Sequence, residues 1–118
     1  MKITKISGHP DDLKFVAVYI INQFGTTTVD SGYVPDYEDG DELPFRVFSF
    51  MFDDYEVSAE KFDKIIANLH KICGRNPMEG IVVYVDIDGV KKTVRVRDGI
   101  DYRYSADYTE IKKMIQME

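Results

Sequence analysis

The segment Phe45–Gly74 constrains the fold of this chain more than any other stretch. It opens with alternating residues, so that Phe48, Phe50 and Phe52 fall on one face of a predicted strand whose other face is also mostly apolar. After an acidic break at residues 53–56, apolar side chains recur at helical spacing to the end of the segment. The apolar stripe of this helix consists of Phe62, Ile65, Ile66, Leu69, Ile72 and Cys73. The pattern predicts a helix packed on a sheet, in which the strand is central or covered on both sides.

Turn residues and helix signals divide the remaining chain. Pro10 and the two acidic residues after it favour a helix over residues 10–24. The same region is rich in β-branched and aromatic residues, so a strand over residues 13–22 is the alternative. The predicted elements outside the opening segment are a strand ending at Ser7-Gly8, the helix over 10–24, an edge strand over Thr26–Tyr33, the hairpin strands Ile81–Ile87 and Val90–Arg97, a short strand over Ile100–Tyr104, and a last helix capped by Ser105 or Asp107.

These elements predict a single α+β domain over residues 1–118, with a mainly antiparallel sheet and two or three helices packed on it. The first six elements fit the ferredoxin-like βαββαβ pattern, to which a strand and a C-terminal helix are added. If residues 13–22 form a strand, the prediction changes to a longer antiparallel meander with two helices on one face.

The negative charge of the chain is concentrated in one block. The net charge is −6 and the pI about 4.9, which disfavours general binding to nucleic acid or to anionic membranes. Residues 30–63 hold 11 acidic and 2 basic residues. The block predicts a non-enzymatic protein-interaction module that binds a partner with a basic surface. The predicted partner-binding residues are Asp36, Tyr37, Glu38, Asp39, Asp41, Glu42, Asp53 and Asp54.

In charge and size, though not in any motif, the chain is similar to small acidic inhibitors that compete with nucleic acid for a basic groove, many of which phages encode. The alternative function is a binder of nucleotides or small phosphorylated ligands. Cations beside aromatic rings can hold a phosphate and stack a base. The residues predicted for that site are Lys91, Arg95, Arg97, Tyr102, Arg103 and Tyr104.

The run His9-Pro10-Asp11-Asp12 resembles the zinc-binding motif of amide hydrolases of the N-acetylglucosaminyl deacetylase type. The resemblance would make His9 and Asp12 zinc ligands and Asp11 a general base. Leu13 stands where that family usually has an acidic residue, and the chain is far shorter than that fold. A helix start made by proline and acids is therefore the favoured interpretation, and no metal, cofactor or catalytic residue is predicted.

The remaining features concern location and assembly. The chain has no apolar run of the length a membrane span needs. A single cysteine, Cys73, agrees with a reducing compartment, so a cytoplasmic location is expected. His70 and Cys73 share a helix face, but Cys73 continues the apolar stripe and is expected to be buried. Met114, Ile115 and Met117 are a candidate surface for homo-oligomer formation.

Overall fold

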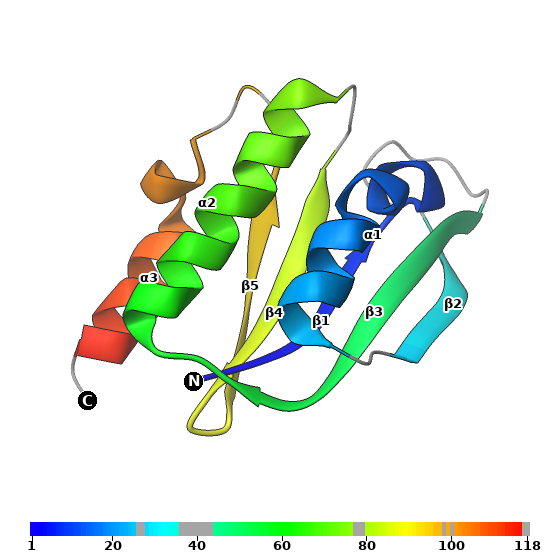
Figure 1. Ribbon diagram of the computed structural model, residues 1–118. Helices are drawn as coiled ribbons and strands as arrows, with labels where there is room; N and C mark the ends of the chain where they lie inside the picture. The colour runs from blue at the N-terminus through cyan, green and yellow to red at the C-terminus, as the bar shows by residue number, and fades with distance from the viewer. Residues whose placement is uncertain (26–27, 36–43, 77–79, 98, 100, 117–118) are drawn as a thin grey trace.

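The computed structural model describes residues 1–25, 28–35, 44–76, 80–97, 99 and 101–116 (Figure 1). For residues 28–35, 44–47, 53, 54, 104, 106 and 116, only the backbone is described. The elements are β1 (Lys2–Gly8), α1 (Pro10–Phe24), β2 (Thr28–Pro35), β3 (Pro44–Glu56), α2 (Ala59–Arg75), β4 (Ile81–Ile87), β5 (Val90–Val96), the 3₁₀ turn η1 (Tyr102–Tyr104) and α3 (Ala106–Gln116). This order confirms the predicted α+β fold class.

The five strands form one antiparallel sheet in the order β2-β3-β1-β4-β5. Strands β1 and β2, which flank α1 in the sequence, are separated in the sheet by β3. Strands β3 and β4, which flank α2, are separated by β1. Two such split β-α-β units make the ferredoxin-like arrangement, and β5 and α3 are the predicted additions. The alternative meander is wrong, because residues 13–22 lie within a helix.

Helix α1 forms because its ends are well defined. The N-cap is His9, whose Nδ1 accepts a hydrogen bond from the backbone N–H of Asp11 at 3.1 Å. Pro10 occupies the first helical position, where the missing N–H costs nothing. Gly25 ends the helix with a φ of 76°, a conformation that glycine adopts without strain. These local signals outweigh the strand propensity of the β-branched residues between them.

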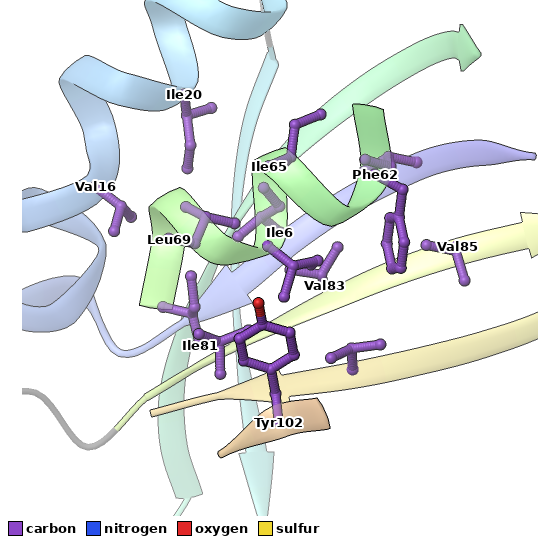
Figure 2. Packing of buried hydrophobic residues seen from close by; sticks show 14 of the residues in the cluster. Ile6, Val16, Ile20, Phe62, Ile65, Leu69, Ile81, Val83, Val85 and Tyr102 are labelled. Carbon is purple, nitrogen blue, oxygen red and sulfur yellow. The ribbon is translucent and has the colours of Figure 1, made fainter. Parts of the chain in front are cut away.

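All three helices lie on one side of the sheet (Figure 1). Figure 2 shows Leu69 of α2 close to Ile6 of β1 and Val83 of β4, and these residues belong to one buried cluster with Ile65 of α2 and with Val16 and Ile20 of α1. The largest fully buried side chains are Phe62, Ile3, Ile6, Ile20, Ile65, Ile66, Leu69, Ile81, Ile111, Val16, Val83 and Val85. The core therefore fills the layer between the helices and one face of the sheet.

Two expectations about β3 are corrected by the sheet. The acidic residues 53–56 do not end the strand, because the pairing of Lys2 with Glu56 keeps the β3 backbone hydrogen-bonded to β1. β1, rather than β3, is the central strand, and no described helix covers the second face of β3. Ser58 caps α2 as expected, accepting a hydrogen bond from the N–H of Lys61 at 3.1 Å.

The expected short strand over residues 100–104 is also wrong. Residues 102–104 form the turn η1, which the Asp101 carboxylate caps by accepting the N–H of Arg103. Tyr102 is buried in the core, and its ring lies edge-on to those of His70 and Tyr108. Because residues 102–104 form a turn and not a strand, the Tyr102 ring lies beneath the helices. Ser105 then caps α3, as one of the two predicted candidates, by accepting the N–H of Tyr108 at 3.1 Å.

Candidate functional site

The open face of the sheet, which is the side that no described helix covers, carries side chains in three rows across β3, β1, β4 and β5. The first row runs Met51, Lys5, Tyr84, Thr93. The second row runs Ser49, Ser7, Val82, Arg95, and the third runs Glu56, Lys2, Asp86, Lys91. We call the residues of the first two rows the open-face patch. Because strands lie about 4.8 Å apart, each row is about 14 Å long.

The centre of the open-face patch is a pairing of a cation with an aromatic ring. The ammonium of Lys5 lies 4.4 Å from the centroid of the Tyr84 ring, which is within the range of a cation–π interaction. In the next row, the hydroxyl groups of Ser7 and Ser49 are hydrogen-bonded to each other at 2.6 Å. Met51 adds an apolar side chain that is 38% exposed. The patch thus combines apolar, aromatic, hydroxyl and cationic groups on a rigid sheet.

The arrangement of charged residues differs between the open-face patch and the third row. In the third row acidic and basic residues alternate, so Glu56 and Asp86 offset the charges of Lys2 and Lys91. In the two rows of the patch, by contrast, the charged residues are Lys5 and Arg95, and Asp86 of the third row lies diagonal to Lys5, two residues from Tyr84 on β4. The described open face therefore carries both cationic and acidic groups.

The predicted partner-binding residues fall into two groups. Asp36, Tyr37, Glu38, Asp39, Asp41 and Glu42 are outside the described residues, while Asp53 and Asp54 belong to β3, where only their backbone is described. The strands that flank the undescribed segment extend past the rest of the sheet. Pairing of β1 with β3 ends at Gly8 and Phe48, whereas pairing of β2 with β3 continues to Pro35 and Pro44. The acidic segment is thus joined to the end of a two-stranded ribbon.

The residues predicted for the alternative, phosphate-binding site do not come together. Lys91 and Arg95 lie on the open face, and Arg97 follows the end of β5. Tyr102 is buried on the helix side. The guanidinium of Arg103 binds the Asp101 carboxylate through two nitrogens, at 2.9 and 2.7 Å, and these bonds lower the pKa of Asp101 to about 2. The side chain of Tyr104 is outside the described part.

The zinc-like motif has a structural role at the start of α1. His9 is the N-cap, and the buried Asp12 carboxylate accepts the backbone N–H of Gly80 at 3.1 Å, which ties α1 to the beginning of β4. Across the described residues, no group of three or more histidine, cysteine or carboxylate side chains is placed to hold a metal ion. His70 packs against Tyr102, and Cys73 is fully buried, as its place in the apolar stripe predicted.

Sequence reasoning missed most of the open-face patch. Lys91 and Arg95, which were predicted to belong to one site, do lie on one face of β5, because a hairpin of known turn fixes its own register. Nothing in the sequence groups Lys5, Tyr84 and Met51 in one site, because they belong to three strands that are distant in the sequence. Each also has an ordinary interpretation as an isolated surface residue.

Comparison of the chain with protein families, with curated proteins and with solved structures gave no match. No described helix combines the length and the apolar character needed to cross a membrane. What the fold and site define is an α+β domain with helices on one face of its sheet and a surface of mixed apolar and charged residues on the other. The function is therefore argued from that surface.

Proposed function

We propose that this chain is a non-enzymatic protein-interaction module whose recognition surface is the open face of its sheet. The observation that carries the proposal is the one-sided arrangement of the helices, which leaves Met51, Tyr84 and Arg95 on a face without described cover. Tyr, Met and Arg are the residue types enriched in protein interfaces over the rest of a protein surface. A rigid sheet also holds them in place before binding, which reduces the entropy lost on association.

The acidic segment is a second surface through which the same function could act. Four residue pairs of β2 and β3, from Gly32–Val47 to Pro35–Pro44, extend beyond the end of β1. At about 3.3 Å per residue, the ribbon reaches about 13 Å past the neighbouring strand. This position supports contact between the acidic residues 36–42 and a partner with a basic surface. A cytoplasmic location stays part of the proposal, since the single cysteine is a buried thiol.

The proposal is tested by capturing partners from the native cells with three purified variants of the tagged chain. The first variant carries Tyr84→Ser with Met51→Ser, on the open face. The second, a matched control, carries Val18→Ser with Ile21→Ser, which are the most exposed apolar residues on the helix side at 70% and 53%. The third replaces the five carboxylates of residues 36–42 by amides. Thermal melting confirms that each variant is folded.

We expect a partner that the wild type and the control variant capture and that the open-face variant loses. Truncation of a hot-spot residue at the centre of an interface weakens binding by about 2 kcal/mol or more, which is at least about thirtyfold. If the open-face variant captures the partner as well as the wild type does, the open face is not the recognition surface. Loss confined to the amide variant would assign recognition to the acidic segment instead.

A further inference from the structure

We infer that the open face of the sheet packs against the open face of a second copy of this chain, so that the chain forms a two-fold symmetric dimer. The inference rests on the proposed function and names the partner of the same surface. The third row carries it, because its charges alternate in sign from β3 to β5. This row consists of Glu56, Lys2, Asp86 and Lys91. A row of four alternating charges is complementary to its own reversed copy, which is what an isologous contact requires.

The symmetry axis that uses this complementarity runs parallel to the strands, midway between β1 and β4. A two-fold rotation about that axis lays β3 of one copy over β5 of the other, and β1 over β4. In the third row, Glu56 would then face Lys91 of the second copy, and Lys2 would face Asp86. The hairpin turn holds the Asp86 carboxylate in place for this contact, because its Oδ1 accepts the N–H of Gly89 at 2.8 Å.

The first row fits the same axis. Lys5 would face Tyr84 of the second copy, while its ammonium lies 4.4 Å from the centroid of the Tyr84 ring in its own chain. Each ammonium would therefore lie between two aromatic rings, which favour a cation and separate it from the ammonium of the other copy. At the ends of the row, the exposed side chain of Met51 would face Thr93.

The net charge of −6 is compatible with this contact, because the charge is unevenly distributed over the strands. The sequences of β2 and β3 contain four acidic residues and one basic residue, whereas that of β5 contains three basic residues and no acidic one. The axis lays the basic strand of each copy over the acidic strands of the other. In the second row Arg95 would face Ser49, so no two cations face each other in the three described rows. Repulsion between more distant carboxylates is screened beyond about 8 Å at physiological ionic strength.

Two other symmetric arrangements fit the described residues less well. An axis perpendicular to the strands, through the first row, would place Lys5 over Lys5 and Lys91 over Arg95. Those contacts would bring like charges together at the centre and at the edge of the interface. A dimer formed through α3 would use Met114 and Ile115, but both of these side chains pack against the core of their own chain.

The size of the sheet limits the strength of the dimer. The sheet has five strands, and β1, β4 and β5 each have seven residues. At about 4.8 Å between strands and about 3.4 Å per residue, its face measures about 24 Å by 24 Å. Two such faces would bury about 1,150 Å² in total, which is close to the lower limit for a specific interface. We therefore expect a dissociation constant of about 1–100 µM.

The test is analytical ultracentrifugation of two single variants, Glu56→Lys and Lys91→Glu, each alone and then mixed in equal amounts. In either variant alone, both symmetric contacts between positions 56 and 91 would join like charges. In the mixture, each reversed charge would face an opposite charge on the other variant. The matched controls are Glu60→Lys and Lys64→Glu, which make the same charge changes at an exposed ion pair of α2. Thermal melting confirms that each variant is folded.

We expect the mass of the wild type to rise from 13.6 kDa toward twice that value as its concentration increases. Each exposed charge pair contributes about twofold to fivefold, so each open-face variant alone should dimerise at least about fourfold to 25-fold more weakly. The mixture of the two should dimerise as strongly as the wild type. The α2 variants should match the wild type when alone and should gain nothing when mixed.

A wild type that stays monomeric at about 500 µM, well above the expected dissociation constant, would overturn the inference. A mixture no heavier than the separate variants, or dimerisation that Tyr84→Ser with Met51→Ser leaves unchanged, would do the same. If capture of a different protein depends on Tyr84 and Met51 while the purified chain is monomeric, the inference fails and the proposed function stands. If the dimer forms as expected while the open-face variant still captures another protein, the proposed recognition surface fails and the dimer stands.

Discussion

The attachment of α3 to the rest of the domain depends on a carboxylate that two groups share. The Tyr108 hydroxyl donates a hydrogen bond to Oδ1 of Asp63 in α2, and the Lys112 ammonium binds Oδ2 of the same carboxylate. Tyr108 is 8% exposed, and its ring also meets Phe62 and Tyr102. We predict that Tyr108→Phe destabilises the domain while leaving the packing of the ring intact.

The expected loss is about 1–2 kcal/mol at neutral pH. A hydrogen bond to a charged group contributes about 1.5–3 kcal/mol, and the partial exposure of Asp63, 39% for its side chain, lowers this value. The Asp63 carboxylate keeps Lys112 as a partner in the variant, so no buried charge is left unpaired. Urea unfolding measures the change. Tyr19→Phe is the matched control, because the hydroxyl of Tyr19 accepts a hydrogen bond from the exposed amide of Asn68 at 3.2 Å, and it should cost less than about 0.5 kcal/mol.

The pH dependence gives an independent check of the same contact. Burial, together with the hydrogen bond to Asp63, raises the pKa of Tyr108 above its ordinary value of 10.0. A group whose pKa is higher in the folded state stabilises the protein fully below its unfolded pKa, and this contribution is lost as the pH rises beyond it. The wild type should therefore lose more stability than Tyr108→Phe when the pH is raised above 10. Equal losses in the two proteins, or a Tyr108→Phe effect no larger than that of Tyr19→Phe, would refute the reasoning.

Two further predictions concern features with a competing functional interpretation. Addition of Zn²⁺ should leave the melting temperature unchanged. Asp12→Ala should lower the free energy of unfolding by about 1–3 kcal/mol, because it leaves the backbone N–H of Gly80 unpaired. A rise in melting temperature with Zn²⁺ that Asp12→Ala removes would restore the metal-site hypothesis. Val18→Ser with Ile21→Ser should change the free energy of unfolding by less than about 1 kcal/mol, since both side chains are largely exposed. A larger loss of stability that grows with protein concentration, together with a dimer mass in light scattering, would show that α1 forms a homo-oligomer contact.

The local parts of the fold could be predicted because their signals lie close together in the sequence. Ser58 and the apolar stripe behind it specify α2, and Asp88-Gly89 specifies the β4–β5 hairpin, in which Asp88 has a φ of 51°. Residues 13–22 were ambiguous because α1 carries apolar side chains on its exposed side as well, including Val18. Residues 100–104 were misassigned because burial of one ring, Tyr102, depends on α2 and α3 and has no local periodic signal.

The open-face patch could not be predicted because it depends on the register of β1 against two strands that are distant in the sequence. A shift of one residue in that register would move Lys5 to the helix side and Ile6 to the open face. The spacing of Ile3 and Ile6 is itself informative, because both are fully buried although residues three apart in a regular strand point to opposite faces. The irregularity between Ile3 and Lys5 resolves this conflict, because it gives β1 one more residue than β4 at this point. Two buried isoleucines at odd spacing in a short strand thus predict a bulge, and the bulge is what sets Lys5 beside Tyr84.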